Sequence, residues 1–527
     1  MADPNRIFTV DGKPFFPVGG QATNQGGYSA ERAEPAFQAV QALHGNTLLV
    51  PVYWELVEPQ EGTSDFGIVD ALLASARRHE MRLVLLWFAT WKNGNMDYSP
   101  AWAKSDPQRF RRVTGRDGRP LWVLSSHCPA TNEADRRTFA ALCAHLKAVD
   151  GRERTVIALQ IENEPGIIGS DRDYGPEAQA AFGGAVPAQL MKRLKAAGGG
   201  GLFDLWQRAG GKGPGTWTEA FGRDAGEVMT AWSIASYIDK VAEAGKAAYD
   251  LPMYVNVWLH QDWEVAGESY PSGGAVRNAL DVYKWFAPHL DLIAPDIYIA
   301  DSRGYEAICA TYRREDNPLY VPESAPRGSN AWLMFRAIAD YDAIGYHCFA
   351  VERALAEDGS VRPEAQPLVE SFQCVAAAAP LLLKHQGTGK VHAVVQEENQ
   401  WMQRLDLDGY VGKVQFGPVR GPGARPDDGV ERRGRGLVIQ AGMHKFYLVG
   451  DCFRLALRRK RPPHNAVDLG SSSVYFTLPL HQFISVEEGR FDGAGRFVVA
   501  HRRNGDDISQ GLWVTPETGV VRAILCD

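Results

Sequence analysis

The sequence of 527 residues lacks an excess of charge of either sign. It contains 56 Lys and Arg against 63 Asp and Glu, which gives a formal net charge of −7 and a pI near 6.0. Proteins that bind nucleic acids or anionic membranes usually present strongly basic surfaces. The composition therefore predicts neither a nucleic-acid nor a membrane partner.

The sequence also lacks a long apolar run and a recognisable cysteine motif. No stretch of about 18 apolar residues, enough to span a bilayer, is present. The seven Cys are scattered without a CxxC pair, so we expect buried free thiols. The start, MADPNRIFTV, has no basic segment followed by an apolar one. The compartment stays unknown: periplasmic or secreted if a signal peptide has been removed, and otherwise cytoplasmic.

What the sequence does contain is an alternation of apolar strands and amphipathic helices over its first 385 residues. Helical spacing of apolar residues is seen, for example, at 29–44, 133–149 and 227–249. Eight apolar runs of strand length lie at 15–20, 46–54, 81–89, 155–161, 252–259, 291–299, 318–324 and 344–351. This alternation predicts an α/β fold, a (β/α)₈ barrel over 1–385. A glycine-rich stretch at about 169–226 predicts a long loop insertion that covers or shapes the site.

The pattern changes after residue 385. Short runs with alternating apolar and polar residues follow, separated by Gly, Asp and Asn turns. This predicts an all-β accessory domain over 386–527, most simply a sandwich.

The stretch TVIALQIENEPG, 155–166, carries the strongest functional signal. It is an apolar strand that ends in Glu162, Asn163 and Glu164. Alternation along a strand predicts that Glu162 and Glu164 share a face. Because parallel barrels place catalytic side chains at the carboxyl ends of their strands, Glu164 is a candidate catalytic residue. The alternative is a strand that runs into a polar loop.

A second carboxylate, Glu323, lies at the end of the predicted seventh strand, in LYVPES. A retaining glycosidase needs two carboxyl groups about 5–5.5 Å apart, one as acid/base and one as nucleophile. Strands four and seven end at the same mouth, so Glu164 and Glu323 can face one sugar ring. Asn163 is placed to bind the sugar 2-hydroxyl. Taken alone, Glu323 could instead be a salt-bridged strand end.

Asn163-Glu164-Pro165 on one strand and a Glu on the seventh resemble the clan A retaining TIM-barrel glycosidases. QIENE, 160–164, resembles glycoside hydrolase family 35, the β-galactosidases. A second block, with some family 42 character, agrees with this resemblance and comprises Gly45-Asn46-Thr47, Tyr53-Trp54, Glu58-Pro59, Glu61-Gly62 and Phe66.

Three positions depart from the family 35 pattern. Val57 stands where the family has His, and Pro165 where it has an aromatic residue. Phe88-Ala89-Thr90-Trp91 replaces Cys-Ala-Glu-Trp, so the carboxylate that normally touches galactose is absent. Glu162 either replaces that carboxylate in part or is a buried structural partner.

Other side chains are candidates for substrate binding. Tyr53 lines the sugar subsite or belongs to the core, and Trp91 is a candidate in the loop after the third strand. Trp258 offers a ring on which a pyranose can stack. The resemblance implies that Tyr298, near the end of the sixth strand, hydrogen-bonds the nucleophile. His347 on strand eight is better explained as a satisfied polar group than as a metal ligand, and we expect no metal and no cofactor.

The sequence therefore predicts a retaining exo-β-glycosidase, foremost a β-galactosidase, with Glu164 as acid/base and Glu323 as nucleophile. Its expected partner is an oligosaccharide or a polysaccharide side-chain glycoside, and a homo-oligomer is left open. The alternatives are a β-glucosidase, β-xylosidase or α-L-arabinopyranosidase of the same clan, and a non-catalytic carbohydrate-binding barrel. A lyase or aldolase is disfavoured, because no Lys is expected at a strand end.

Overall fold

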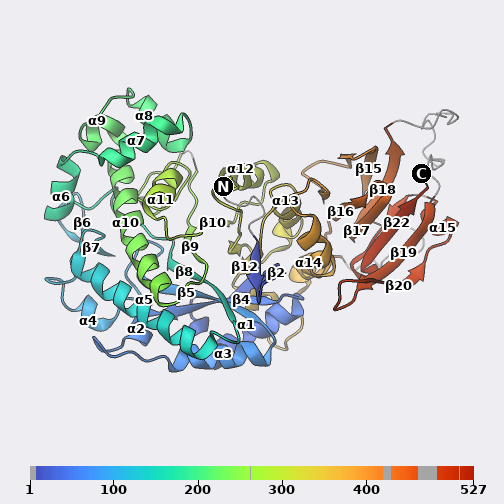
Figure 1. Cartoon of the computed structure of the whole chain (residues 1–527), viewed down its shortest axis with the longest axis horizontal. Helices are drawn as coiled ribbons and strands as arrows, with labels where there is room; N and C mark the ends of the chain where they lie inside the picture. The colour runs from blue at the N-terminus through green and yellow to red at the C-terminus, as the bar shows by residue number, and fades with distance from the viewer. Residues whose placement is uncertain (1–6, 262, 419–428, 461–482, 510, 527) are drawn as a thin grey trace.

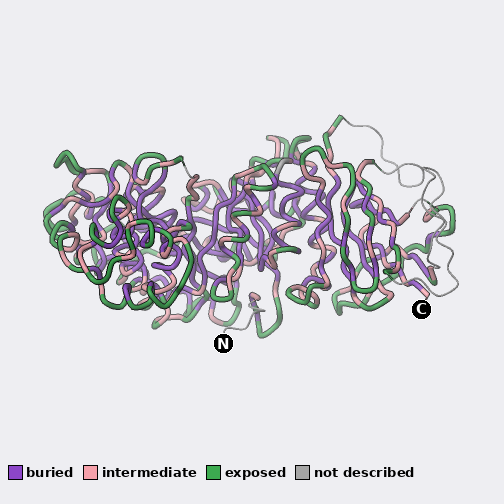
Figure 2. The backbone as a smooth tube through the Cα atoms, turned by 90° about the horizontal axis from the view of Figure 1, so that it is seen from above, coloured by how far each residue is buried: buried purple, intermediate pink, exposed green. Residues whose placement is uncertain are grey.

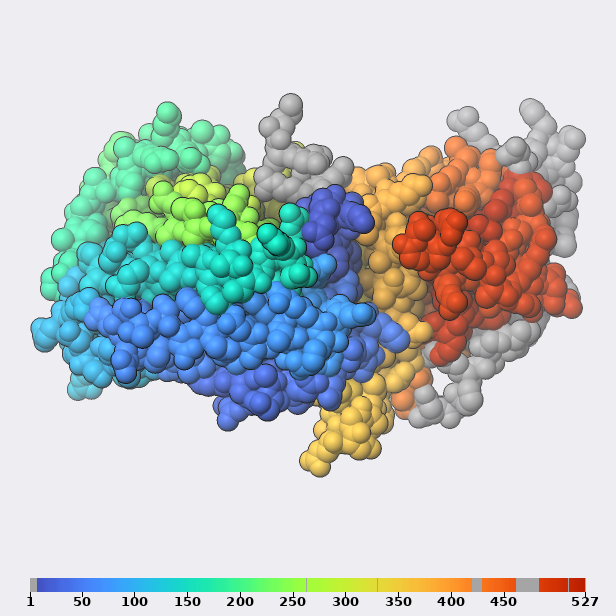
Figure 3. Space-filling view, turned by 60° about the horizontal axis from the view of Figure 1, so that its bottom comes forward, coloured from blue at the N-terminus to red at the C-terminus, as the bar shows by residue number. Residues whose placement is uncertain are grey.

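The computed structural model describes residues 7–261, 263–418, 429–460, 483–509 and 511–526. Figure 1 shows a barrel surrounded by helices at one end of the molecule and β-sheets at the other. Helix α14 (Gln366–His385) lies between them. Figure 3 shows the C-terminal strands as a lobe beside the barrel.

Eight parallel strands form the barrel, hydrogen-bonded in the order β11-β10-β9-β8-β5-β4-β3-β12. In chain order they are β3 (Val18–Gln21), β4 (Thr47–Tyr53), β5 (Arg82–Lys92), β8 (Val156–Asn163), β9 (Met253–Val257), β10 (Leu292–Ile297), β11 (Glu323–Ser324) and β12 (Tyr346–Phe349). A bridge between Val321 and Tyr346 joins the two ends of this order and closes the barrel. The predicted barrel is thus confirmed, with one strand from each predicted run.

The strands are apolar because the barrel buries them on both faces. Every residue of β4 is buried, and Figure 2 shows the same for the inner strands. β3 is the exception in composition, since it contains Gly19 and Gly20. A Cβ at Gly19 would lie 2.1 Å from the carbonyl oxygen of Thr47, so only glycine allows this close approach to β4.

Helices cover the outside of the barrel. They are α1 (Ala30–Ala42), α2 (Trp54–Val57), α3 (Gly67–Arg78), α4 (Ala101–Lys104), α5 (Pro129–Asp150), α10 (Ala225–Ala248), α11 (Leu280–Phe286), α12 (Ser302–Tyr312) and α13 (Leu333–Ala339). Short 3₁₀ turns are η1 (Gly26–Tyr28), η2 (Gly222–Asp224), η3 (Gly328–Asn330), η4 (Val351–Ala354), η5 (Pro363–Ala365) and η6 (Pro516–Thr518).

Two hairpins accompany the barrel strands. β1 (Phe8–Val10) pairs with β2 (Lys13–Phe15), and Phe8 packs against Tyr320 of the barrel interior at 5.5 Å between ring centres. The second hairpin, β6 (Arg112–Thr114) with β7 (Pro120–Leu124), lies between β5 and α5 in the chain.

The insertion after β8 is helical, which corrects the prediction of a loop. It contains α6 (Pro176–Gly183), α7 (Ala188–Ala197), α8 (Gly201–Arg208) and α9 (Trp217–Phe221). Leu190, Leu194, Leu202 and Leu205 are buried and belong to the main core. The abundant glycines suggested a loop, but they lie largely between the helices, where Gly198 and Gly210 adopt positive φ.

The C-terminal part consists of two antiparallel sheets. The first contains β13 (Val391–Val395), β16 (Arg435–Gly442), β17 (Lys445–Asp451), β22 (Val520–Leu525), β19 (Phe483–Phe491) and β20 (Phe497–Arg502). The second contains β14 (Met402–Leu407), β15 (Tyr410–Phe416), β18 (Phe453–Arg459) and β21 (Leu512–Trp513), and a short helix α15 (Gly505–Ile508) precedes β21. Residues of both sheets share one core, including Val438 and Leu455, which agrees with the predicted β-rich accessory domain.

Helix α14 is the one segment among the described residues with the length and composition of a membrane span. The window lies in Pro363–His385, has a mean hydropathy of 1.2 and is 61% buried. Leu368, Phe372 and Leu382 belong to the core that the barrel shares with β13 and β16. This burial is typical of a core helix, and the boundary at residue 385 stays a prediction because α14 contacts both parts.

Candidate active site

The two predicted catalytic carboxylates lie at the same end of the barrel. Glu164 follows β8 directly, and Glu323 begins β11. Only β9 and β10 separate these strands in the sheet. Both side chains are almost fully buried, with 8% of Glu164 and 5% of Glu323 exposed.

Side chains from the two intervening strands link this pair. The backbone N–H of Glu164 donates to Asn256 Oδ1 on β9 at 2.8 Å. Asn256 Nδ2 donates in turn to Asp296 Oδ2 on β10, also at 2.8 Å. Asp296 pairs in register with Glu323. The chain of contacts therefore runs across four neighbouring strands, from β8 to β11.

Glu323 receives one hydrogen bond on each carboxylate oxygen. The Tyr298 hydroxyl donates to Oε2 at 2.6 Å, and Gln21 Nε2 donates to Oε1 at 2.8 Å. Donors on both oxygens stabilise the ionised form and fix the orientation of the carboxylate. Burial, followed by the negative charge of Glu323, raises the pKa of Tyr298, so the phenol keeps its proton to donate.

Glu164 has the electrostatic environment of a general acid. Burial, followed by the negative charge of Glu323, raises its pKa to about 7. Lys92 and the hydrogen bonds of Asp296 and Asn93 oppose this rise. The Asn93 bond joins Nδ2 to Glu164 Oε2 at 2.6 Å. At neutral pH, Glu164 therefore exchanges a proton readily, as an acid/base must.

Lys92 ends β5 and is 8% exposed. Its ammonium group contacts Asn93 Oδ1 and lies 5.1 Å from the ring centre of Phe88. The prediction that no Lys stands at a strand end is wrong, because β5 continues three residues beyond the predicted end at Ala89. Lys92 supplies the positive charge that offsets the buried carboxylates.

The expectation that Glu162 and Glu164 share a face is wrong. Both residues have left-handed backbones, with φ of 61° and 45°, so the alternation of the strand breaks at its end. Glu162 Oε2 accepts the backbone N–H of Trp91 at 2.7 Å, and its carboxyl group interacts with Asp135 of α5. Glu162 is therefore the buried structural partner that the sequence left as the alternative.

Glu162 and Asp135 form a second pair of buried acids, which we call the outer cluster. Asp135 accepts hydrogen bonds from Trp87, Thr90 and Tyr237, at 2.8–3.0 Å. Burial, followed by the negative charge of Asp135, raises the pKa of Glu162 well above its usual value. Burial also raises the pKa of Asp135, so this pair favours a protonated carboxyl group behind the barrel wall and not in its mouth.

Three other predicted substrate contacts have no exposed surface. Tyr53 lies in the barrel interior and donates to the carbonyl of Asn24, and Trp91 packs edge-on against Tyr237. Asn163 is enclosed between Asn93 and Asn256, at 3.4 and 3.3 Å. These positions do not support direct contact with a sugar. Asn163 instead contacts two residues that bind Glu164.

Trp258 and Tyr298 are the two predicted binding residues that keep exposed surface, 36% and 45% respectively. Each lies one residue beyond its strand, β9 or β10.

His347 is fully buried and burial lowers its pKa to about 3, so it is a neutral core side chain. No group of three His, Cys, Asp or Glu side chains suited to a metal is found in the part of the chain that the structure describes.

Sequence reasoning missed Asp296, Lys92 and Gln21. Asp296 had a visible signal, since it precedes Tyr298 by two residues within the predicted strand 291–299, where the alternation of side chains places both on one face. Gln21 lies one residue beyond the predicted end of the first strand.

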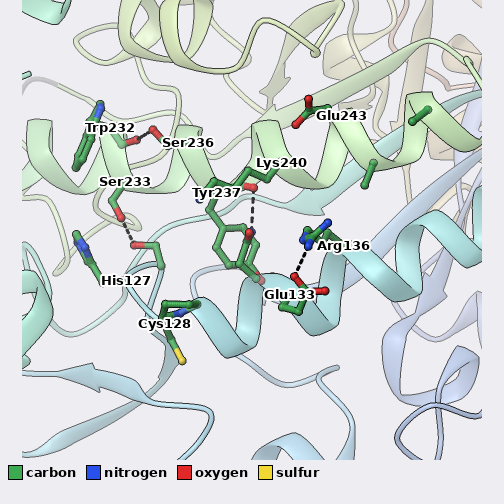
Figure 4. A pocket seen from close by; sticks show the side chains of 15 residues that line it. His127, Cys128, Glu133, Arg136, Trp232, Ser233, Ser236, Tyr237, Lys240 and Glu243 are labelled. Carbon is green, nitrogen blue, oxygen red and sulfur yellow. Dashed lines mark hydrogen bonds and ion pairs between the residues drawn. The ribbon is translucent and has the colours of Figure 1, made fainter.

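A separate cavity of about 850 Å³ lies outside the barrel, between α5 and α10 (Figure 4). His127, Glu133 and Arg136 line one side, and Trp232 and Lys240 line the other. Tyr237 connects its wall to Asp135 in the outer cluster. The cavity includes neither Glu164 nor Glu323, so it is distinct from the barrel mouth.

Comparison with known proteins gives two family matches and two curated relatives. Residues 29–197 match the family model "Beta-galactosidase" (glycoside hydrolase family 42), and residues 368–515 match a domain of unknown function, DUF5597. A β-galactosidase of Xanthomonas manihotis is 27% identical over 192 residues, 33% of this chain and 28% of the relative. A β-galactosidase of a Thermus species is 31% identical over 137 residues, 26% of this chain and 20% of the relative. The chain thus spans less than a third of the length of either relative.

The solved structures that match this chain include two β-galactosidases. The enzyme of Rahnella sp. R3 has a TM-score of 0.49 at 16% identity, covering 72% of this chain and 58% of that chain. The enzyme of Bacillus circulans sp. alkalophilus has a TM-score of 0.48 at 16% identity, covering 69% and 56%.

The family 42 match covers β4, β5 and β8, and it includes Glu164. The resemblance to family 35 stays a prediction, whereas the family 42 character is now supported by the sequence match and by both relatives. The first half of the barrel thus resembles glycoside hydrolase family 42 in sequence.

Proposed function

We propose that the chain is a retaining exo-acting β-galactosidase with Glu323 as nucleophile and Glu164 as acid/base. The observation that carries this proposal is the contrast between the two carboxyl groups at one end of the barrel. Glu323 accepts two hydrogen bonds that favour its anion, whereas Glu164 has a pKa of about 7 that favours proton exchange. Such divergent environments are what assign nucleophile and acid/base roles in a carboxyl pair.

The reaction proceeds by two displacements. The Glu323 carboxylate attacks the anomeric carbon, the glycosidic bond breaks, and Glu164 gives its proton to the departing oxygen. Water then attacks the same carbon and breaks the ester to Glu323, while Glu164 takes the proton from water. Because each displacement inverts the anomeric carbon, the product keeps the β configuration. Both carboxyl groups return to their starting states.

Glycosylation changes the electrostatics of Glu164 in the direction that the cycle needs. While Glu323 is an anion, its charge helps to raise the pKa of Glu164, so Glu164 begins as an acid. Esterification removes that charge and lowers the pKa, which turns Glu164 into a base.

The substrate class we propose is a terminal β-D-galactoside on an oligosaccharide or polysaccharide side chain. The family 42 match and the names of both curated relatives support galactose. Thr90 occupies the position of the missing family 35 carboxylate and donates to Asp135 in the outer cluster. This departure keeps β-glucosidase, β-xylosidase and α-L-arabinopyranosidase activities as alternatives.

A panel of nitrophenyl glycosides, followed by proton NMR, tests the proposal. We expect the β-galactoside to be the best substrate and β-galactose to be the first product. Another preferred glycoside would correct the specificity, and α-galactose as the first product would refute retention. Binding without turnover across the panel would favour a non-catalytic carbohydrate-binding barrel.

The role of Glu323 is tested by Glu323→Gly with added azide. Loss of the nucleophile should reduce hydrolysis by about 10⁴-fold or more, and azide should partly restore turnover with an α-galactosyl azide as product. The matched control is Glu323→Gln, which is equally inactive but leaves no space for azide. Wild-type activity in either variant would refute the assignment.

A further inference from the structure

A third carboxyl group, Asp296 on β10, lies between the two proposed catalytic carboxylates. It pairs in register with Glu323, and Asn256 binds both Asp296 and the backbone of Glu164. Asp296 is 3% exposed. The double displacement as described assigns it no role, although a buried carboxyl group at this position affects both partners.

The hydrogen bonds of Asp296 and Glu323 differ. Glu323 has an N–H or O–H donor on each oxygen, whereas Asp296 has the Asn256 amide on Oδ2 alone. No N–H or O–H donor in the described chain serves Asp296 Oδ1. Glu164 is within hydrogen-bonding reach of Asp296 if one of the two carboxyl groups carries a proton. This arrangement favours an anion at Glu323 and a neutral acid at Asp296.

The charges around Asp296 also favour its neutral form. The ionisable groups that face it from neighbouring elements are Glu164, Glu323, Lys92, Tyr254, Tyr298 and Tyr312. Burial raises the pKa of all three tyrosines, so these phenols are neutral at pH 7. Lys92 is then the one cation that the described residues place among three buried carboxyl groups. Since like charges in a buried site cannot all ionise, one anion at Glu323 balances Lys92, Asp296 stays neutral, and Glu164 ionises only near its pKa of about 7.

We propose that Asp296 is a positioning residue that stays protonated at neutral pH and donates a hydrogen bond through Oδ1 to Glu164 whenever Glu164 is ionised. This inference rests on the proposed function. Asp296 neither gives up nor gains a proton over the cycle. Its hydrogen bond stabilises Glu164 as the base that receives the proton of the attacking water, so its effect falls on the second displacement.

The variants Asp296→Asn and Asp296→Ala separate the effect of a hydrogen-bond donor at position 296 from the effect of a negative charge there. The amide of Asn keeps a neutral donor toward Glu164 and an acceptor for Asn256, so we expect kcat within about threefold of wild type. The decline of kcat/KM at alkaline pH, which reports Glu164, should stay at the same pH. Asp296→Ala loses the donor, so kcat on an activated aryl galactoside should fall about tenfold. KM should fall with it, because the glycosyl-enzyme accumulates, while kcat/KM changes less than threefold.

Two outcomes would overturn the proposal. If Asp296 were ionised, Asp296→Asn would remove a negative charge beside Glu164 and shift the alkaline decline of kcat/KM to lower pH by a unit or more. If Asp296 were only structural, Asp296→Ala would lower kcat and kcat/KM together.

A spectroscopic test is independent of glycosidase activity. The infrared difference spectrum between wild type and Asp296→Asn at pH 7 should show the carbonyl band of a protonated carboxyl group, and ¹³C labelling of aspartate should shift that band. A difference spectrum with only carboxylate bands would overturn the proposal. An inactive wild-type protein that still shows the protonated band would count against the proposed function and not against the state of Asp296.

Discussion

Two of the buried clusters of acidic side chains in this protein differ in how their charge is balanced. In the barrel mouth, Glu164, Asp296 and Glu323 share one cation among the described residues, Lys92. At the junction with the β-sheets, Arg435 forms ion pairs with Glu370 of α14 and Asp451 of β17. Arg432 adds a second cation there, 3.3 Å from Glu370. Among the described residues, the mouth is therefore poor in positive charge, whereas the junction has one arginine for each acid.

The backbone conformation also differs between the barrel mouth and the junction. Glu164 has a φ of 45°, which is rare for a residue with a side chain. Arg435 and Asp451 instead lie opposite each other in the regular ladder between β16 and β17. Strain and unbalanced charge thus coincide at the proposed active site. Burial of acids alone therefore does not mark function: of these two clusters, the one at the proposed active site is the one with a deficit of counter-charge.

The largest effect expected in the mouth is that of Glu164→Ala on activity. Turnover of substrates with poor leaving groups should fall by about 10²–10⁴-fold, because the general acid is lost. Activated aryl galactosides should retain a much faster first step, with slow deglycosylation. The matched control is Glu162→Gln, two residues away in the outer cluster, which should change kcat less than threefold. Equal losses of activity in both variants would contradict the distinction between the barrel mouth and the outer cluster.

The junction should respond in stability and not in catalysis. Arg435→Met removes the cation that pairs with both Glu370 and Asp451, so the free energy of unfolding should fall by about 3–5 kcal/mol. Chemical denaturation measures this loss, and kcat per folded molecule should not change. A double variant that also carries Glu370→Leu should recover part of the stability. An Arg435→Met protein as stable as wild type would contradict the contrast between a catalytic mouth and a structural junction.

Lys92→Met tests how the positive charge of Lys92 affects the pKa of Glu164 in the barrel mouth. Lys92 lowers the pKa of Glu164, so its removal should raise that pKa further. The alkaline decline of kcat/KM should then move to higher pH by about one unit, a shift equivalent to about 1.4 kcal/mol. Lys92→Arg keeps the charge and should leave the profile near that of wild type. A shift toward lower pH in Lys92→Met would have the wrong sign.

Another effect concerns the dependence of stability on pH. The pKa of Glu164 rises from its usual 4.5 to about 7 on folding, so the folded state favours the protonated form. The corresponding stability is fully present below about pH 4.5 and is lost as pH rises through 7. Glu164→Gln cannot ionise, so its melting temperature should exceed that of wild type increasingly between pH 5 and pH 9. A gap that narrows as pH rises would contradict the assignment.

The sequence predicted the barrel because its strands are buried on both faces and therefore apolar throughout. It predicted Glu164 and Glu323 because both end such strands, and the family resemblance pointed to Tyr298. Asp296 was missed because it lies inside the predicted strand 291–299, and only carboxylates at the ends of apolar strands signalled a catalytic role.

The remaining errors have local backbone causes. The left-handed φ at Glu162 and Glu164 turns their side chains to opposite sides, and nothing in QIENE signals that conformation. Lys92 was missed because β5 extends past the apolar run through Thr90, whose hydroxyl is satisfied by Asp135. The helices of 176–221 were hidden by the glycines that separate them.

The most direct test of the central claim is to trap the glycosyl-enzyme. Incubation with a 2-deoxy-2-fluoro-β-galactosyl fluoride, followed by peptide mass spectrometry, should show one fluorosugar per chain on the peptide that contains Glu323. The label should appear in Glu162→Gln and be absent in Glu323→Gln. An active enzyme that forms no adduct, or one labelled on Glu164, Asp296 or any other residue, would contradict the assignment of Glu323 as nucleophile.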